Sequence, residues 1–130
     1  MTWYVSIDQV LAIHAFQIRR YGGSHGLRDR GALEAALARP QMTFGGEDLY
    51  PDLPAKAAAV MHSLVMNHPF VDGNKRVGAH LALLFVRAND WQPLFAPSEL
   101  TEMTLAVARG EVEAEALAIW LRQRQRPRDR

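Results

Sequence analysis

Nine consecutive residues, 68–76, bring together side chains that could transfer a phosphoryl or nucleotidyl group. The segment reads HPFVDGNKR and lies between two stretches of helical periodicity. A loop that opens a helix directs the helix's free backbone N–H groups and its positive dipole end outward, which favours phosphate binding. Lys75 and Arg76 place two cations at this helix start. Positive charge is otherwise unfavourable there, so the pattern indicates an anionic ligand.

The other polar residues of the segment complete such a site. Asp72 could hold Mg²⁺ against phosphate oxygens, and His68 could take a proton near neutral pH. Gly73 permits a tight turn close to a ligand, and Asn74 could hold the loop or donate to an oxygen. Each residue alone also fits a cap, a turn or an exposed charge. Together they favour a catalytic site, and Phe70 fits a core anchor in either case.

Helical periodicity and capping signals predict six helices around this segment. Ser6 and Gln9 form a capping box before the first helix, which Gly22 ends. The helices that follow are expected over 31–39, about 54–66, 75–88, 97–110 and about 113–125. The fourth contains LALLFV, which is apolar on every side, and we expect it to be the buried central helix.

Residues 41–53 read QMTFGGEDLYPDL, are not periodic, and predict a long exposed loop or a short hairpin flap. Residues 3–5 and 94–95 suggest at most a minor two-stranded pairing. The expected fold is therefore all-α: a compact single-domain helical bundle of about six helices that spans residues 1–130.

Length and composition exclude several classes of protein. The 130 residues suffice for one domain, and 48% hydrophobic with 22% charged residues is typical of a globular chain. The absence of cysteine excludes disulfides, thiolate zinc sites and cysteine nucleophiles. No apolar run is long enough for a membrane span, and the first residues lack the pattern of a signal peptide. The sequence therefore predicts a soluble cytoplasmic protein.

The net charge of +1 is unevenly distributed. From residue 122 onward the chain has five Arg and one Asp, a formal charge of +4, so residues 1–121 carry −3. We expect residues 123–130 to form a frayed basic tail, because no aromatic residue is interleaved with its arginines. A body of this charge is not expected to bind DNA directly.

Segment 68–76 resembles the central motif of the Fic/Doc family, which reads HPFx(D/E)GNGR in the branch that transfers nucleotides. Lys75 stands where that branch has Gly and the death-on-curing (Doc) toxins have Lys, and Ala79 replaces a second Arg of that branch. GLRDRGALEAALARPQ, at 26–41, is similar to the GxRDxGxLExAxxRP stretch of the Doc toxins. Gly73 is closer to the nucleotidylating branch, so AMP transfer stays open as an alternative.

The resemblance implies a toxin kinase that moves the γ-phosphate of ATP to a Ser or Thr hydroxyl of a translation protein. Elongation factor Tu is the expected target, and its modification would halt translation and growth. His68 would deprotonate the hydroxyl, and Asp72 would hold Mg²⁺. The phosphates would be bound by the four residues that follow: Gly73, Asn74, Lys75 and Arg76.

The resemblance also implies contacts with other proteins. The expected flap would align the target beside the site and contains Thr43, Phe44, Gly45 and Gly46. The self-inhibitory motif of Fic proteins is missing, because Met103 follows Glu102 where Gly or Asn is required. An active toxin would therefore need a cognate antitoxin, whose disordered tail folds into a groove on the toxin. A catalytically silent antitoxin-binding module is a further alternative, although the intact motif argues against it.

Overall fold

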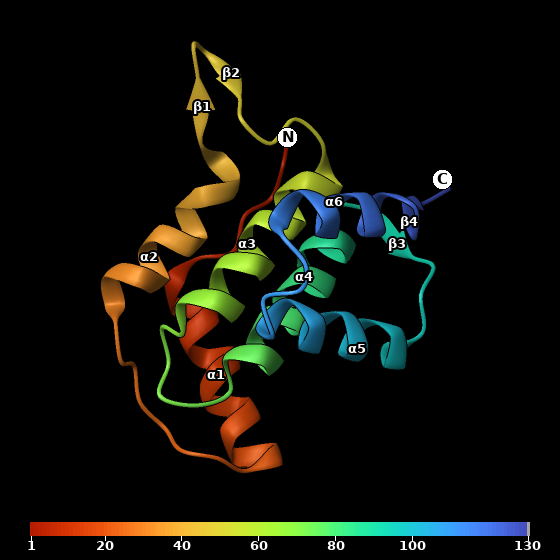
Figure 1. The fold of residues 1–130 in the computed structure, drawn as a ribbon. Helices are drawn as coiled ribbons and strands as arrows, with labels where there is room; N and C mark the ends of the chain where they lie inside the picture. Colours follow the sequence, from red (N-terminus) through yellow and green to blue (C-terminus); the bar gives the residue numbers. More distant parts are fainter. Residues whose placement is uncertain (130) are drawn as a thin grey trace.

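Capping side chains set where the helices begin in the computed structural model, which describes residues 1–129 (Figure 1). The Ser6 hydroxyl accepts from the Gln9 backbone N–H, and the Gln9 side chain accepts from the Ser6 N–H in return. Asp29 and Asp52 cap the second and third helices through one backbone N–H each. The predicted all-α bundle is confirmed, with helices α1 (Ile7–Tyr21), α2 (Arg30–Ala38), α3 (Leu53–Asn67), α4 (Asn74–Ala88), α5 (Pro97–Ala108) and α6 (Ala114–Arg122).

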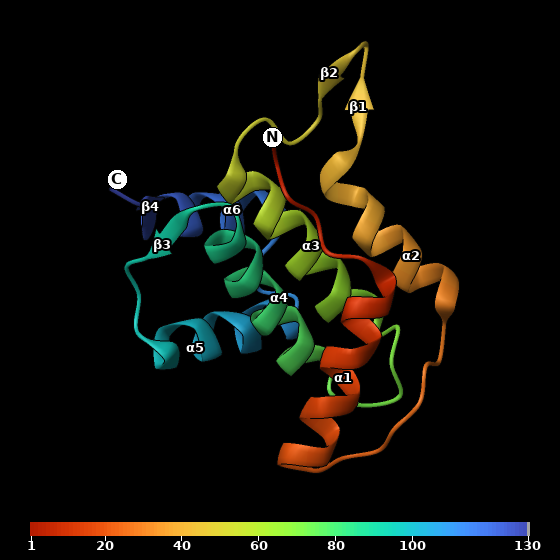
Figure 2. The same cartoon turned by 180° about the vertical axis from the view of Figure 1, so that it is seen from behind.

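The third helix, not the fourth, is the central one. Between Leu53 and Val65 every residue of α3 is buried except His62, whereas α4 buries one face and leaves Leu83 and Leu84 partly exposed. Alanines at 55 and 57–59 let the neighbouring helices approach α3 closely. α1 and α2 lie on one side of the α3–α4 pair, and α5 and α6 lie on the other (Figures 1 and 2). The expectation that the helix with LALLFV is central was therefore wrong. In this bundle the buried central helix is the one rich in small residues, because alanine allows other helices to pack closely on several sides.

The α3–α4 contact is especially close at Gly78. A Cβ atom at this position would lie 2.7 Å from Cγ2 of Val65, a distance that side chains do not tolerate. The close approach fixes α4 against α3, and with it the loop of residues 68–73 that joins the two helices. The core thus holds both ends of the segment that carries the candidate chemistry.

The residues between α2 and α3 form a short hairpin, the second of the two alternatives that the sequence left open. β1 (Thr43–Phe44) pairs antiparallel with β2 (Glu47–Asp48), and a 3₁₀ turn (Arg39–Gln41) leads into it from α2. Gly45 and Gly46 both have positive φ, which a two-residue hairpin turn requires and glycine permits. Residues 41–49 are all exposed, and the hairpin projects from the body (Figures 1 and 2).

The second strand pairing differs from the expectation. β3 (Trp91–Pro93) pairs with β4 (Gln125–Pro127), so α6 ends at Arg122 and residues 125–127 are not frayed. The Leu94 N–H donates to the Arg124 carbonyl at 2.7 Å, and Gln125 is buried. The side-chain amide of Asn89 instead engages both backbone groups of Trp3, which keeps residues 3–5 out of a sheet. The sequence hides this pairing because its partners are more than 30 residues apart and one is rich in Arg.

The longest helices, α1, α3 and α4, have 15 residues each. A bilayer span needs about 20 predominantly apolar residues. Within residues 1–129, no helix combines the length and apolar character that crossing a membrane requires.

Candidate active site

The loop between α3 and α4 is held by the segment that precedes α2. The backbone N–H groups of Arg28 and Asp29 both donate to the Pro69 carbonyl, at 2.8 and 2.9 Å. The Val71 N–H donates to the Gly26 carbonyl at 3.0 Å, next to an isolated β-bridge between Leu27 and Phe70. Residues 26–29 therefore act as a short backbone template for the loop, a role that periodicity alone does not indicate.

Arg28 also fixes the end of α3 at His68. Its Nε donates to the His68 carbonyl at 2.8 Å, and Nη2 donates to the Asn67 carbonyl at 3.0 Å. These carbonyls lie at the helix C-terminus, where a cation is favoured. His68 has φ 47° and ψ 58°, a left-handed conformation that is uncommon outside glycine. The Arg28 contacts hold this conformation, and the His68 side chain stays exposed beside the loop.

Asn74 closes the loop from the other end. Its Oδ1 accepts from the Phe70 N–H and its Nδ2 donates to the Phe70 carbonyl, both at 2.9 Å. Phe70 itself is 1% exposed and packs in the core with residues of α1 and α2. Both polar atoms of the Asn74 side chain are thus engaged within the protein, which leaves its backbone N–H as the group available to a phosphate.

Asp72 presents an ionised carboxylate at the surface. Oδ2 accepts from the Ser24 backbone N–H at 3.1 Å, and Oδ1 accepts from the Gly73 N–H at 2.8 Å. These two backbone donors, first that of Ser24, lower the pKa of Asp72 below its ordinary value. A Cβ atom at Gly23 would lie 2.7 Å from Oδ2, so the turn after α1 can approach the carboxylate only with glycine there.

His14, on α1, also contacts this loop, although it lies outside the motif at residues 68–76. Its Nε2 lies 2.8 Å from the Asp72 carbonyl oxygen, and its ring stacks on Phe70 with centroids 3.8 Å apart. The residue is 4% exposed. A histidine on the buried face of a helix needs a hydrogen-bond partner. The sequence could therefore have indicated that His14 has a polar partner, but not which one.

The start of α4 gathers the positive charge. Gly73 occupies the N-cap with φ 81° and supplies no side-chain cap, so the first backbone N–H groups of α4 are not capped. Lys75 is exposed, while Arg76 donates to the carbonyls of Gln17 and Gly22 at the end of α1, at 3.4 and 3.2 Å. An open cleft of about 410 Å³ lies here, lined by His68, Val71, Asp72, Gly73, Asn74, Lys75 and Arg76. The fold thus brings together the predicted residues of segment 68–76.

The donor set at this cleft fits magnesium held partly by a substrate. Within residues 1–129, no three His, Asp or Glu side chains form a preformed metal cluster, and Asp72 is the carboxylate that lines the cleft. Mg²⁺ is commonly bound by one or two carboxylates together with substrate phosphates and water. Asp72 could therefore hold the ion once a phosphate occupies the cleft.

The hairpin differs from its expected place beside the site. It precedes α3, whereas the cleft follows that helix, and 15 helical residues span about 22 Å. The ribbon views show the hairpin and the α3–α4 loop at opposite ends of α3 (Figures 1 and 2). Thr43, Phe44, Gly45 and Gly46 do not line the cleft. The hairpin therefore does not border the cleft, and its role in aligning a target protein stays a prediction.

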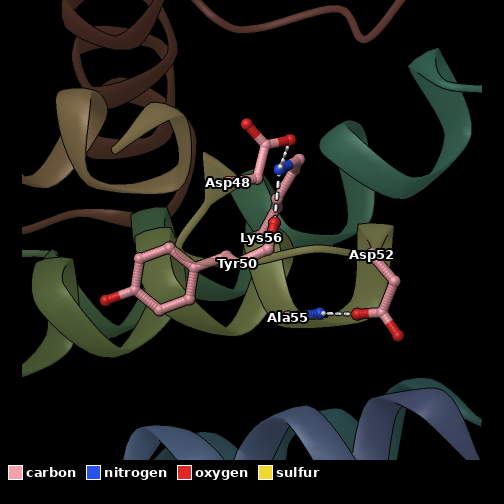
Figure 3. Close-up of polar contacts among 5 residues, drawn as sticks. All are labelled: Asp48, Tyr50, Asp52, Ala55 and Lys56. Atoms are coloured by element: carbon pink, nitrogen blue, oxygen red, sulfur yellow. Dashed lines mark hydrogen bonds and ion pairs between the residues drawn. The ribbon is translucent and has the colours of Figure 1, made fainter. Parts of the chain in front are cut away.

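The base of the hairpin is nevertheless firmly held. The Lys56 ammonium, 6% exposed, donates to the Asp48 carboxylate at 3.1 Å and to the Tyr50 carbonyl (Figure 3). The Tyr50 hydroxyl accepts from Arg39 Nε at 2.8 Å, and Arg39 Nη1 donates to the Ser63 hydroxyl at 2.9 Å. Both sides of the hairpin base are thus tied to α3. No local pattern marks Lys56, because its partners belong to the exposed loop.

Comparison with known proteins finds similarity over the residues that build the cleft. A sequence model of the Fic/DOC family matches residues 4–86. The "Protein kinase doc" of Escherichia phage P1 is 35% identical over 120 residues, which cover 92% of this chain and 94% of that protein. The "Toxin Doc" of Mycolicibacterium smegmatis is 45% identical over 92 residues, which cover 71% of this chain and 68% of that protein.

Proposed function

Because the chain belongs to the Fic/DOC family, we propose that it is a Doc-type toxin that transfers the γ-phosphate of ATP to a Ser or Thr hydroxyl of a protein. The observation that carries the proposal is the uncapped start of α4. Its free N–H groups share one cleft with His68, Asp72 and Lys75. Such a start binds phosphate, and the neighbouring groups supply proton transfer and charge neutralisation.

His68 acts as the general base of the proposed reaction. Its imidazole takes the proton of the acceptor hydroxyl, whose oxygen bonds to the γ-phosphorus while the bond to the β–γ bridging oxygen breaks. ADP leaves with that oxygen, and the proton stays on His68 until solvent removes it. The left-handed conformation of His68, held by Arg28, keeps the imidazole exposed at the cleft. A strained conformation of this kind is common at functional sites.

The positive end of α4 stabilises the charge on the transferred group. The N–H groups of residues 74–76 and the Lys75 ammonium bind the phosphate oxygens. Arg76 contributes its guanidinium, which already lies between α1 and the cleft. Asp72 would hold Mg²⁺, which neutralises phosphate charge when it is bound. The Asp72 carboxylate is ionised at neutral pH, and its two backbone donors lower its pKa further.

Residue 79 favours phosphate transfer over AMP transfer. Ala79 and Arg76 line a second hollow of about 520 Å³, whose other walls include Leu83, Phe95 and Leu100. A small residue at 79 leaves this space, which His80 and Arg87 also line, open next to the phosphate cleft, and a nucleoside could occupy it while the γ-phosphate lies over α4. An arginine at 79 would instead place a second cation there. AMP transfer remains the second candidate because Gly73 matches the nucleotidylating branch.

The proposed acceptor is elongation factor Tu, whose phosphorylation would halt translation and growth. A toxin of this kind needs a cognate antitoxin to keep its host alive, and we include that partner in the proposal. The names of the two relatives, a protein kinase and a toxin, support this combination of activity and effect.

Expression of a His68→Ala variant in bacteria tests the catalytic proposal. We expect the intact protein to arrest growth and the variant to lose the arrest, since the alanine cannot accept the hydroxyl proton. His25→Ala, a change in an exposed loop, is the matched control and should still arrest growth. Persistence of the arrest in a folded His68→Ala protein would exclude the proposed base and would favour a binding module.

A further inference from the structure

We propose that His14 is a positioning residue that keeps the Asp72–Gly73 peptide in the orientation needed for phosphate binding. The inference rests on the proposed function of the cleft, although His14 itself does not line that cleft. It acts through the Asp72 backbone carbonyl, 58 residues away in sequence. The residue is therefore a link between α1 and the start of α4.

The contact between His14 and Asp72 has a defined direction. The acceptor is a carbonyl oxygen and can only accept, so the hydrogen must be on Nε2, which donates across 2.8 Å. The ring also stacks on Phe70 at an interplanar angle of 8°. One face of the imidazole thus packs in the core while its edge holds a peptide oxygen, a combination that Phe or Leu cannot provide.

Without the hydrogen bond from His14, the Asp72–Gly73 peptide could rotate. Gly73 has φ 81° and ψ 12°, and glycine populates both signs of φ with little penalty. In the present orientation the Asp72 carbonyl faces the buried His14, and the Gly73 N–H donates to Asp72 Oδ1 at 2.8 Å. A rotation of this peptide by half a turn would break both hydrogen bonds.

Such a rotation would reverse the electrostatics of the anion site. The carbonyl oxygen of Asp72 would leave the protein interior and add negative partial charge beside the first N–H groups of α4. It would also release the Asp72 carboxylate from one of the two backbone donors that orient it. Phosphate and Mg²⁺ binding would both weaken, although no residue that touches them has changed. The His14 donor stabilises the productive orientation.

A set of substitutions separates the donor from the stacking ring. His14→Phe keeps an aromatic ring on Phe70 but removes the N–H, whereas His14→Gln keeps a donor and loses the ring. Thr104→Val is the matched control, since it removes another buried side-chain donor to a backbone carbonyl, that of Leu100 on α5. If His14→Phe fails to fold, His14→Met replaces it as a donor-free side chain.

The first readout is the backbone amide resonance of Gly73 in the protein alone, which requires no assumption about activity. We expect His14→Phe to shift or broaden this resonance, and His14→Gln and Thr104→Val to leave it close to its original position. An unchanged Gly73 resonance in His14→Phe would overturn the inference. Equal effects of the Phe and Gln variants would overturn it too, because packing and not the donor would then be responsible.

The second readout is the affinity for Mg²⁺ with a non-hydrolysable ATP analogue, measured by titration calorimetry. Loss of one hydrogen bond that orients the site should weaken binding by about three- to tenfold in His14→Phe. His14→Gln should recover most of that loss. If the unaltered protein does not bind the analogue, the proposed kinase fails, and the Gly73 resonance still decides whether His14 holds the peptide.

Discussion

The polar residues of the cleft serve two different purposes. His68, Asp72 and Lys75 are exposed and can reach a substrate, whereas Asn74 is buried with both side-chain polar atoms on the Phe70 backbone. A buried amide with two satisfied partners shapes a loop, and its loss leaves unpaired groups in the interior. Asn74 therefore acts on the proposed chemistry through loop conformation and through its backbone N–H.

An Asn74→Asp variant tests this division. The introduced carboxylate can accept from the Phe70 N–H but repels the Phe70 carbonyl, so we expect a loss of about 2 kcal/mol in the free energy of unfolding at pH 7. A urea denaturation curve measures this loss. Gln41→Glu, an exposed amide-to-carboxylate change, is the control and should change stability little.

The stability of Asn74→Asp should also depend on pH with a definite sign. Burial and the facing Phe70 carbonyl raise the pKa of the introduced carboxyl in the folded state above its unfolded value near 3.9, and we expect them to outweigh the opposite effects of the Phe70 N–H and of the positive end of α4. The protonated form can donate to the Phe70 carbonyl, so its stabilising contribution is present at low pH and is lost as pH rises through the folded pKa. The difference in the free energy of unfolding between Asn74→Asp and the unaltered protein should therefore be smaller at pH 4 than at pH 7. A constant difference would contradict the assigned contact.

Two elements far from the motif in sequence determine its geometry. The template at residues 26–29 pairs with the loop backbone, and α1 with its following turn reaches Asp72 through His14 and Ser24. Arg76 returns the contact by donating to the end of α1. The α4 start is thus fixed by two separate elements, which is the preorganisation that phosphate binding requires.

At the opposite end of α3, Lys56 determines how the hairpin sits. A buried ammonium in the first turns of a helix is unfavourable both for its desolvation and for the helix dipole. Lys56 and Lys75 are the two lysines of a chain that otherwise uses Arg for positive charge. The compact ammonium fits between a carboxylate and a carbonyl, where a planar guanidinium would not.

A Lys56→Met variant should loosen the hairpin with little effect on the rest of the fold. Asp48 is more than half exposed and can return to water, so we expect the free energy of unfolding to change by less than about 1 kcal/mol. Hydrogen exchange of the amides at 43–49 should accelerate relative to the intact protein. Arg30→Met, which breaks the exposed Arg30–Glu34 pair, should leave that exchange unchanged. Unaltered protection of the hairpin in Lys56→Met would show that Lys56 does not hold it.

Capping residues and hydrophobic periodicity predicted where the helices lie, but they could not predict contacts between residues far apart in the sequence. Ser6, Asp52 and Gly22 mark helix ends through their own neighbours, so the helices could be placed from the sequence. The pairing of β3 with β4 and the hold of His14 on Asp72 join residues more than 30 positions apart. Hydrophobic periodicity carries no information about such partners. The prediction that the fourth helix is central was also wrong, since α3 takes that place.

The residues of the candidate site, too, could be predicted only where they are close together in the sequence. The segment 68–76 is contiguous, so the residues that line the cleft could be named from the sequence. The hairpin was expected beside them because of the resemblance alone, although its place before α3 and the length of that helix separate it from the cleft. Arg28 lies in a stretch noted for its resemblance, and its contacts with the end of α3 became visible only in the fold.

The residues that follow α6 join the two ends of the α5–α6 side of the bundle. β4 pairs with β3 and so ties residues 125–127 to the segment that links α4 to α5. Arg124 lies over the Trp120 ring at 4.7 Å, and the Arg128 N–H donates to the Asp90 carbonyl at 2.8 Å. The basic residues therefore include structural contacts that stabilise the α5–α6 side of the core.

Deletion of residues 124–130 should destabilise the protein without disabling the cleft. Removal of β4 and the Trp120 contact should lower the free energy of unfolding by about 1–3 kcal/mol, because several hydrogen bonds and one buried residue are lost. The midpoint of urea unfolding measures this effect. Substitution of Arg126 and Arg128 by Gln, which keeps the chain length, should lower the free energy of unfolding less than the deletion does. Equal stability of the truncated and intact proteins would contradict the structural role of β4.

Transfer of the γ-phosphate can be measured with ATP labelled at either the α- or the γ-phosphate. The purified protein is incubated with Mg²⁺, elongation factor Tu and each labelled ATP in turn, with His68→Ala in parallel. We expect label to reach the factor from the γ position alone and His68→Ala to transfer none. Label from the α position would contradict the kinase and establish AMP transfer. Absence of both labels, with the same result in a whole lysate, would contradict the proposed transferase activity.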